Sequence, residues 1–305
     1  MKTKRTLLGR MRYYRGVYLL ALLPFTYLLL FKYLPMVGVY IAFTDFNPMK
    51  GIFLSPFAGL KHFKRLFMFP DILIRLLRNT FVISGMRIII GFPIPIILAI
   101  LLNEKRHQIS KRVYQTVLYV PHFISLVVVA SITTIILSPS SGIINFVLIK
   151  LGFDPIPFLF KQQYFRWIIV FQSIWQHSGW ATIIYLAALS GIDPNLYDAA
   201  AIDGVGRLGR IRHIAIPGIM NTIIILLILR IGKLIDENFQ QIFLMLNSLT
   251  WEVGDVFETY VFRMGIQLGQ VSFAAAVGFF KAIVALVMVI GANRVARRFG
   301  YKGIY

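Results

Sequence analysis

Long apolar runs alternate with shorter polar segments along the whole chain. A helix needs about 20 apolar residues to cross the hydrocarbon core of a membrane. Each run is long enough, so each predicts one transmembrane helix. The six runs cover residues 17–43, 80–102, 113–137, 167–189, 219–235 and 272–292. We therefore expect an all-α integral membrane protein with six transmembrane helices in a single domain over residues 1–305.

The segments that flank these runs predict the orientation of the chain. A basic leader, residues 1–16, precedes the first run and resembles the start of a signal peptide. The run is too long and no A-x-A-like cleavage site follows it, so we interpret it as a retained anchor. With six crossings, the leader, the basic loop 104–112, the segment 190–217 and the basic C-terminal tail fall on one side of the membrane. Because basic residues favour the cytoplasmic side, we expect both termini in the cytoplasm.

Composition agrees with a membrane protein and excludes several other classes. The chain is 58% hydrophobic and 14% charged, with a mean hydropathy of +0.74, which is outside the range of soluble domains. The net charge of +20 is explained by loops that face anionic lipid headgroups, so no nucleic acid partner is expected. The chain has no cysteine, and its five histidines lack the H-E-x-x-H spacing of a metal site. We therefore expect neither a metal site nor catalytic residues.

Two kinds of segment are expected on the external side. Residues 60–78 interleave basic and apolar side chains, which predicts an amphipathic helix in the outer interface of the membrane. The simplest explanation is that lysine and arginine side chains on this helix extend to the lipid headgroups. The segments 138–166 and 238–270 contain turn signals, and we expect them to form compact caps over a pathway.

Residues 190–217 form a charged, glycine-rich segment between the fourth and fifth runs. Asp193 is placed as an N-cap with Pro194 at the first helical position, and the helix is expected to stop at Gly204. The glycines that follow allow a reversal into a second, basic turn that is expected to end before Pro217. By composition alone, a solvated loop whose arginines meet lipid phosphates is the preferred interpretation.

This segment also resembles a known signature. The stretches 198–200, 203–204 and 214–217 are similar to the E-A-A-x-x-x-G and I-x-L-P elements of ABC importer permeases, with Asp198 in place of the usual Glu and Ile216 in place of Leu. The resemblance implies a cytoplasmic coupling loop over residues 190–217 that docks into a cleft on an ATPase subunit. The residues expected to make this contact are Asp198, Ala199, Ala200, Asp203, Gly204, Arg207, Arg210 and Pro217.

The resemblance extends over nearly the whole chain. The segments 31–36, 55–60, 119–125, 137–139 and 239–244 are similar to the carbohydrate-uptake branch of these permeases, and more narrowly to permeases for polysaccharides and complex oligosaccharides. It implies the type I ABC importer fold in a bacterial inner membrane. It also implies three kinds of partner: a second related permease, two ATPase subunits and an external solute-binding protein.

ATP hydrolysis is expected outside this chain. The sequence has no G-x-x-x-x-G-K-[ST] phosphate-binding loop, since Gly232 and Lys233 are followed by leucine inside an apolar run. We therefore expect that the chain is not an enzyme, that it binds no cofactor, and that ATP is used by its partner subunits.

The fourth run carries candidate residues for the substrate pathway. Gln172, Gln176 and Trp180 recur at i, i+4 and i+8, with Trp175 and His177 beside them. Amide groups next to a flat indole suit a sugar, which offers hydroxyl groups at its rim and C–H groups on its face. The alternative is that these polar groups form hydrogen bonds between helices and only fix the bundle.

The fifth run carries charges within an apolar stretch. Arg230, Lys233 and Glu237 lie at i, i+3 and i+7, with Asp236 and Asn238 nearby. Such charges must face protein or water. One interpretation is a self-contained ion pair of Lys233 with one of the two carboxylates. The other is that the cations attract an anionic glycan, for which alginate is an example.

A different class of transporter also remains open from the sequence. Asp236, Glu237 and His177 offer a relay for an ion-coupled secondary carrier, whose usual mark is an inverted repeat. No convincing repeat relates the two halves of the chain. An ATP requirement for uptake would separate the importer from the carrier.

Overall fold

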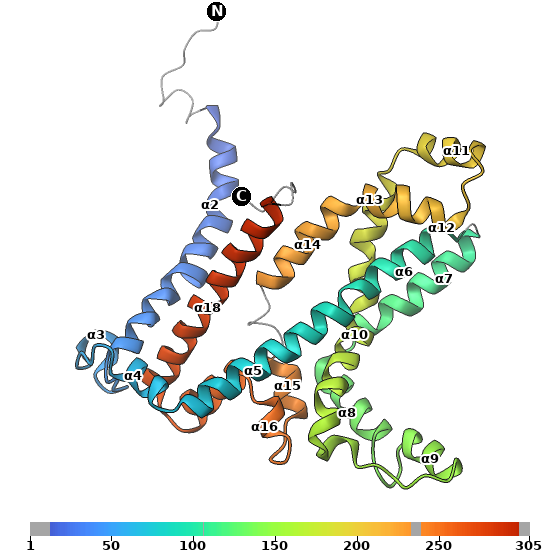
Figure 1. Cartoon of the computed structure of the whole chain (residues 1–305). Helices are drawn as coiled ribbons and strands as arrows, with labels where there is room; N and C mark the ends of the chain where they lie inside the picture. Colours follow the sequence, from blue (N-terminus) through green and yellow to red (C-terminus); the bar gives the residue numbers. More distant parts are fainter. Residues whose placement is uncertain (1–12, 106, 233–238, 299–305) are drawn as a thin grey trace, which may run out of the picture. The chain divides into compact units, whose positions relative to one another are not determined.

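The computed structural model describes residues 13–105, 107–232 and 239–298. Within these ranges the chain is almost entirely helical (Figure 1), and the only extended pairing is an isolated antiparallel bridge between Thr44 and Phe57. The chain divides into two compact units. The first comprises residues 1–68 and 264–279, and the second comprises residues 69–263 and 280–305.

The first unit contains the first predicted span as one continuous helix, Arg15–Phe43. It consists of α2 (Arg15–Leu28), a π-helical turn (Leu29–Tyr33) and a 3-10 segment (Leu34–Phe43). None of the side chains in its most apolar window is buried inside the described structure. An apolar helix without cover from its own chain requires lipid or another protein around it.

Polar and aromatic contacts close the other end of the first unit. Its short helices are α3 (Gly51–Leu54) and α4 (Lys61–Met68). The Asp45 carboxylate lies 2.8 Å from Lys61 Nζ and 3.1 Å from His62 Nε2. The hydrogen bond from Lys61 is the main cause that holds the pKa of Asp45 below its ordinary value. The rings of Phe43, Phe63 and Phe279 pack together with centroids 5.2–6.0 Å apart.

The single amphipathic helix expected over residues 60–78 is wrong, because the structure divides this segment. Helix α4 ends at Met68, and α5 (Pro70–Met86) begins one residue later with Pro70 at its first turn. Proline has no N–H to continue a helix and disfavours helical geometry at the residue before it, here Phe69 (φ −115°, ψ 72°). Arg75 and Arg78 consequently belong to the start of a long membrane-spanning helix.

The second unit is organised around two long helical rods. One runs over Pro70–Asn103 and consists of α5, a π-helical turn (Arg87–Gly91) and α6 (Pro93–Asn103). The other is α10 (Gln162–Ser190), whose 29 residues extend over about 43 Å. Two buried clusters join α10 to its neighbours, one with α6 and the segment around Ala215 and the other with α5, α8 and α15.

Two of the predicted spans are bent rather than straight. The run 113–137 consists of α7 (Gln108–Tyr119) with a 3-10 turn (Val120–Phe123), then a 101° bend into α8 (Leu126–Ile136). Pro121 removes a helical donor, and the Ser125 hydroxyl caps α8 by accepting a hydrogen bond from the Val128 N–H at 3.4 Å.

The second bend follows the basic turn. Helix α12 (Arg207–Arg210), a π-helical turn (Ile211–Ala215) and α13 (Ile216–Gly218) form one helical stretch, which bends by 59° into α14 (Met220–Gly232). The helix was expected to end before Pro217, and this is wrong because the helical stretch continues through Pro217 to Gly218 and bends only after it.

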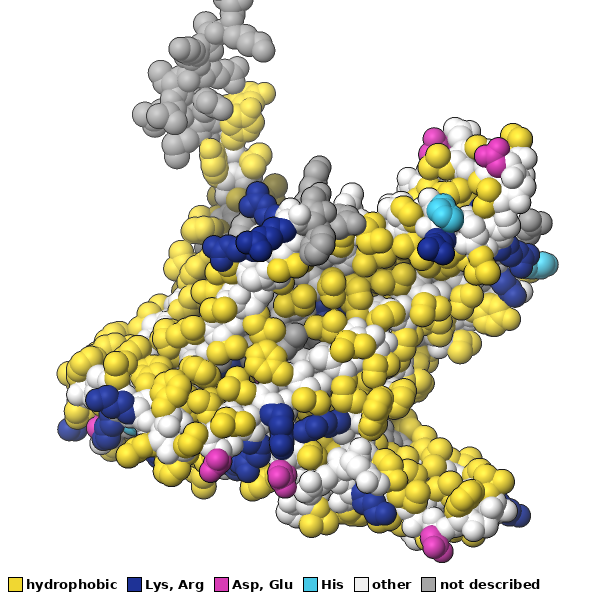
Figure 2. Space-filling model, in the orientation of Figure 1, with side chains coloured by type: hydrophobic (Ala, Val, Ile, Leu, Met, Phe, Trp, Pro, Cys, Tyr) yellow, Lys and Arg dark blue, Asp and Glu magenta, His cyan; other side chains and the backbone are white. Residues whose placement is uncertain are grey.

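Length and composition identify three described helices able to cross a membrane, Arg15–Phe43, Pro70–Asn103 and Val271–Val295. The count rises to five if each bent pair forms one span. Helix α10 has sufficient length but carries more polar side chains than the others. Hydrophobic side chains cover most of the face that Figure 2 shows, as helices in a membrane require. The number of six spans stays a prediction.

Hydrogen bonds fix the segment 251–263 onto the helices of the second unit. It contains α16 (Trp251–Gly254) and α17 (Phe257–Phe262), while α15 (Phe239–Met245) precedes it. The buried Asn79 amide donates to the main-chain oxygens of Glu252 and Asp255, both at 2.9 Å. Arg166 donates to Asn79 Oδ1 at 2.8 Å and to the Val253 carbonyl at 3.1 Å.

The remaining described helices are α9 (Ile143–Lys150) and α18 (Val271–Arg298), of which α18 contributes to both units. A buried amide, that of Asn145, closes the 138–156 loop around α9 by accepting a hydrogen bond from the Ile156 N–H at 2.7 Å and donating to the Ser138 carbonyl at 3.0 Å.

The crossing of α7 and α10 depends on Gly179. A Cβ atom at this position would overlap the main-chain carbonyl of Leu118, which cannot move aside as a side chain could. We expect Gly179→Ala to destabilise the protein by about 1–3 kcal/mol, the usual cost of overpacking, and to lower Tm by several degrees in detergent. Gly85→Ala is the matched control, because nothing lies within 4 Å of its added methyl group. Equal Tm values for the two variants would contradict the assignment.

Candidate translocation face and coupling surface

The predicted amide face of α10 turns inward. Gln172 and Gln176 are buried, and their amide groups bond to neighbouring segments. Gln172 Nε2 donates to Thr133 Oγ1 on α8 at 2.8 Å, and Gln176 Nε2 donates to the Ile124 carbonyl at the bend between α7 and α8, also at 2.8 Å. These contacts have the geometry of the interhelical alternative, in which the amides fix the bundle.

The same network contains two residues that the sequence analysis missed. Arg87 lies in the π-helical turn between α5 and α6, is buried, and donates to Gln241 Oε1 at 2.6 Å. Gln241 in turn donates to Gln172 Oε1 at 2.5 Å and to the Ile169 carbonyl at 3.0 Å. An arginine inside the apolar run 80–102 is the signal that could have revealed this network, since intramembrane charges need partners.

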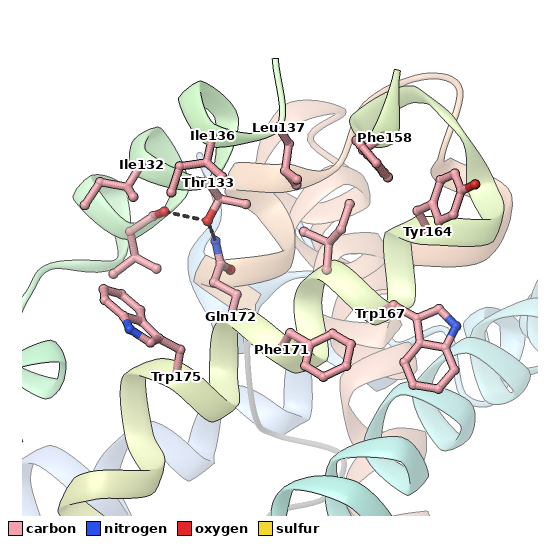
Figure 3. Close-up of a pocket in the computed structure, with 12 residues that line it drawn as sticks. Ile132, Thr133, Ile136, Leu137, Phe158, Tyr164, Trp167, Phe171, Gln172 and Trp175 are labelled. Carbon is pink, nitrogen blue, oxygen red and sulfur yellow. Dashed lines mark hydrogen bonds between the residues drawn. The ribbon is translucent and has the colours of Figure 1, made fainter. Parts of the chain in front are cut away.

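Aromatic side chains occupy the adjoining, more exposed face of α10. Trp167, Phe171 and Trp175 recur at i, i+4 and i+8 with 46%, 57% and 47% of their surfaces exposed. They line a cavity of about 530 Å³ together with Thr133 and Gln172 (Figure 3). The side chains labelled in Figure 3 reach this space from α8, from α10 and from the segment that precedes α10. Of the predicted pathway residues, Gln172 and Trp175 therefore meet in one cavity.

His177 and Trp180 lie elsewhere on α10, against the bend between α7 and α8. The His122 ring stacks on Trp180 with centroids 4.7 Å apart and 6° between the planes, and it meets His177 edge-on at 5.8 Å. His177 also lines a small polar pocket with Arg87 and Arg230. These side chains gather around the bend and do not line the 530 Å³ cavity.

Three predicted pathway residues, Lys233, Glu237 and Asn238, lie outside the described residues, as does the neighbouring Asp236. The ion-pair and glycan-attraction interpretations of this segment therefore stay predictions. Within the described ranges, no group of three histidine and carboxylate side chains could hold a metal ion.

The coupling segment forms the helix that its sequence predicts. Helix α11 (Pro194–Ile202) begins at Asp193, whose side chain accepts a hydrogen bond from the Asn195 N–H at 3.0 Å. It ends in a Schellman motif: the Val205 N–H donates to the Ala200 carbonyl at 2.8 Å, and the Gly204 N–H donates to the Ala201 carbonyl at 3.2 Å. Gly204 has φ +71°, a conformation that favours glycine.

Most of the predicted coupling residues lie on the surface of α11 and α12, at one end of the second unit (Figure 1). Those exposed are Asp198, Ala199, Asp203, Gly204, Arg207 and Pro217, whereas Arg210 is half-buried and Ala200 is buried. Ile202 and Leu208 are 87% and 82% exposed, so large apolar side chains accompany the charged ones. Such a mixture on a helix end is typical of a protein contact.

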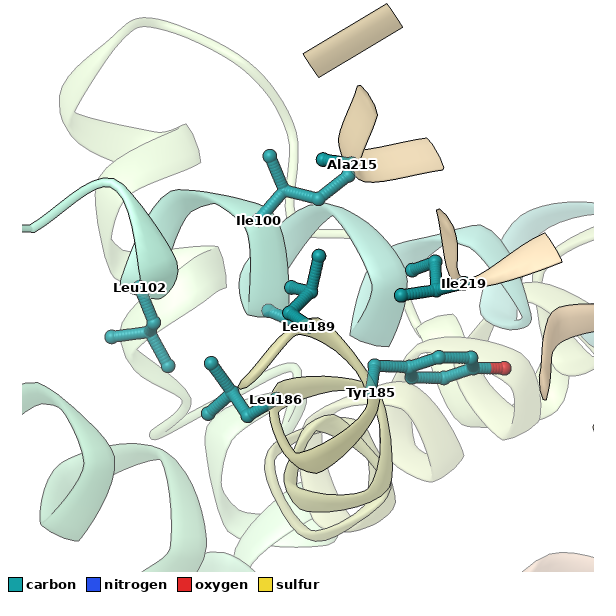
Figure 4. Packing of buried hydrophobic residues seen from close by; sticks show 8 residues of the cluster. Ile100, Leu102, Tyr185, Leu186, Leu189, Ala215 and Ile219 are labelled. Carbon is teal, nitrogen blue, oxygen red and sulfur yellow. The ribbon is translucent and has the colours of Figure 1, made fainter. Parts of the chain in front are cut away.

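The base of this surface is packed firmly onto the membrane helices. Ala215 and Ile219, which follow α12, join Ile100 of α6 and Leu189 of α10 in one buried cluster (Figure 4). The Tyr197 side chain turns inward from α11, and its partial burial is the main cause that raises the pKa of its hydroxyl group. The segment that follows α12 is therefore anchored on α6 and α10.

Residues 91–301 match the protein family described as the inner membrane component of binding-protein-dependent transport systems. The chain belongs to this family. The permease is 45% identical to the polygalacturonan/rhamnogalacturonan transport system permease protein YteP of Bacillus subtilis (strain 168), with 99% of this chain and 94% of that protein covered. It is 46% identical to Protein LplB of the same strain, with 95% and 91% covered.

Solved structures agree with this membership. A chain in the crystal structure of a bacterial alginate ABC transporter in complex with alginate pentasaccharide-bound periplasmic protein is 36% identical, with a TM-score of 0.90 over 98% of this chain and 100% of that chain. A chain of a bacterial ABC transporter involved in the import of the acidic polysaccharide alginate is 37% identical, with a TM-score of 0.88 over 96% and 98%.

These findings confirm the predicted ABC importer permease fold and the inner-membrane location. The permease is a transport subunit rather than an enzyme, and ATP is hydrolysed in a separate subunit. They support the importer and not the secondary carrier that used Asp236, Glu237 and His177.

The central position of Gln241 yields a stability prediction. Gln241→Met removes the acceptor that faces Arg87 and the donor that faces Gln172, both of which are buried. We expect a loss of about 1–3 kcal/mol, the usual cost of a buried unsatisfied polar group, and a Tm lower by several degrees. Gln108→Met, at an exposed position, is the control. An unchanged Tm for Gln241→Met would show that the network does not stabilise the fold.

Proposed function

We propose that the permease imports an acidic oligo- or polysaccharide that an external solute-binding protein delivers, together with a second related permease and two ATPase subunits. Similarity along the entire chain to YteP, and to a solved alginate importer that contains a periplasmic protein, supports this substrate and these partners. The observation that carries the ATP-driven mechanism is α11, an exposed, capped helix whose flanking residues Ile192 and Ala215 take part in the buried packing around α6 and α10.

In this mechanism α11 seats in a cleft of an ATPase subunit. Asp198, Asp203 and Arg207 supply charged contacts at its surface, while Ile202 and Leu208 supply apolar area. Closure of the ATPase pair on ATP moves α11 as a rigid body, and the buried cluster around Leu189 carries that motion into α10. The permease binds no cofactor in this proposal, and ATP acts only through the partner subunits.

On the translocation side, we assign the sugar contacts to the aromatic face of α10. Indole and phenyl rings present flat apolar surfaces to the C–H face of a sugar, while Gln172 and Thr133 offer polar groups at the wall of the same cavity. His177, Trp180 and Arg230 lie farther along the pathway in this assignment. Lys233, Glu237 and Asn238, outside the described residues, stay predicted pathway residues. Gln176 holds the wall in place through its bond to Ile124.

We also propose that both termini and the 190–217 coupling loop are cytoplasmic. An even number of crossings and the basic residues of the leader and the tail support this orientation. The ATPase contact requires the same side for α11.

The proposal predicts ATP-dependent uptake. The complete complex, reconstituted in liposomes with its solute-binding protein, should import oligogalacturonides or alginate oligomers only when ATP is supplied on the ATPase side. Dissipation of proton and sodium gradients should leave the rate unchanged, because the energy comes from nucleotide. Uptake that persists without the ATPase subunits, or that follows an ion gradient, would refute the importer mechanism.

A second prediction concerns Gly204. Gly204→Val forces a β-branched residue into positive φ, which costs about 1–2 kcal/mol and opens the Schellman motif that ends α11. We expect uptake to fall about 10-fold or more while membrane insertion is retained and ATP hydrolysis continues. Uptake and ATPase rates should be measured on the same reconstituted sample.

Two controls isolate the backbone effect. Gly204→Asn should retain most of the coupling, because asparagine tolerates this conformation better than valine does. Gly206→Ala should behave as wild type, because Gly206 has negative φ and nothing lies within 4 Å of an added methyl group. Loss of the Gly204→Val protein from the membrane would instead show that Gly204 is needed for folding of the turn and not specifically for coupling.

A further inference from the structure

The N-terminal end of α10 carries two adjoining hollows that differ from the apolar cavity. One, of about 680 Å³, is lined by Lys161, Gln162, Gln163, Arg166 and Trp167 among others. The second, of about 480 Å³, is lined by Arg75, Arg78, Gln162, Trp251 and Glu252 among others. Gln162 lines both hollows, so the two adjoin. We refer to the two together as the basic hollow. We infer that the basic hollow is a receiving site for the carboxylate-bearing sugar units of an acidic glycan.

This inference rests on the proposed function and deepens it, since it names the residues that select the charge of the substrate. Four cationic side chains, Arg75, Arg78, Lys161 and Arg166, line the basic hollow against two carboxylates, Asp71 and Glu252. An excess of cationic side chains around a concave site attracts an anionic ligand and raises its local concentration.

Two of these four cationic side chains are not neutralised by a nearby carboxylate. Among the described residues, neither Lys161 nor Arg78 lies within 4.0 Å of a carboxylate oxygen, and Arg78 makes only a long 3.5 Å contact with the Glu252 carbonyl. Arg166 is different, because Asn79 and the Val253 carbonyl hold its guanidinium group in place. The basic hollow therefore combines one fixed cation with two cations that have no carboxylate partner there.

Aromatic rings and amides favour a sugar over a bare anion such as a lipid phosphate. Trp167 and Trp251 are each nearly half exposed at the wall of the basic hollow. Gln162 and Gln163 add donors and acceptors that match sugar hydroxyl groups. A flat ring, an amide and a cation side by side are the groups that a uronate residue requires.

The position in the fold agrees with a receiving site. The basic hollow and α11 lie at opposite ends of α10, about 43 Å apart along the helix (Figure 1). If α11 meets the ATPases in the cytoplasm, the basic hollow faces outward, where the positive-inside bias gives no reason for four cations. Trp167 also lines the 530 Å³ cavity, so an aromatic surface leads from the charged site into the apolar one.

The test compares two forms of one substrate. The double variant Lys161→Gln/Arg78→Gln is reconstituted in the full complex, and uptake is measured for oligogalacturonide and for its methyl-esterified, uncharged form. We expect the half-saturating concentration of acidic substrate to rise about five- to ten-fold, with less than about two-fold change for the neutral form. Lys64→Gln, which removes an exposed lysine elsewhere, is the matched charge control.

A second variant separates charge from stacking. Trp167→Leu should weaken uptake of both forms to a similar degree, because a ring that stacks on a sugar face does not sense the carboxylate. Tm values of all variants are measured, so that misfolded protein is recognised. A Trp167→Leu complex of normal Tm and normal uptake would remove the aromatic part of the site and overturn the inference.

Other outcomes would also overturn it. Equal losses for acidic and neutral substrate in the double variant would exclude charge selection. If the double variant docks the solute-binding protein more weakly, whichever sugar that protein holds, the surface is a contact for the binding protein and not a sugar site. A defect that vanishes when anionic lipids are replaced by zwitterionic lipids would identify a lipid headgroup as the ligand. Failure of the wild-type complex to import any acidic glycan would instead refute the substrate proposed above.

Discussion

A polar group inside the membrane-spanning part of this permease must find its hydrogen-bond partner within the protein, because lipid offers none. The side chain of Gln241 makes three such hydrogen bonds. It accepts from Arg87 and donates to Gln172 and to the main chain of Ile169, so three separate parts of the chain are held in one register. Since Gln172 is committed to this network and Gln176 to the Ile124 carbonyl, the exposed face left to the middle of α10 is the aromatic one.

Helix α10 then acts as the rigid element between the two ends of the second unit. It contains no proline and continues for 29 residues, whereas its neighbours break sharply between α7 and α8 and between α13 and α14. The coupling helix is attached at one end of this rod and the basic hollow at the other. Because α10 is unbroken, a displacement of its C-terminal end also moves its N-terminal end, while the bent elements have breaks at which their geometry can change.

The features predicted correctly from the sequence are those set by local chemistry. The N-cap at Asp193 and the positive φ of Gly204 need only their immediate neighbours, and α11 forms as expected. The spacing of Gln172 and Gln176 revealed a polar face, but periodicity does not tell whether a face meets protein or a pathway, and here it meets protein. The break at Pro70, in the amphipathic segment 60–78, and the bend after Pro121, in an apolar run, were missed because periodicity alone does not show whether a helix continues or turns at a proline.

The cationic side chains line the basic hollow and not the apolar cavity, and this separation matters for transport. A polymer has to be captured firmly enough to enter and held weakly enough to move on. Cations deep in a low-dielectric channel would bind each uronate strongly and slow its release. In the permease, the cations of the basic hollow lie near solvent, where their attraction is moderated, while the described cavity beyond Trp167 is lined mainly by apolar and aromatic side chains. For the proposed acidic substrate, selection by charge at the basic hollow and sliding over rings in the apolar cavity are thus compatible, because each would take place where the local dielectric suits it.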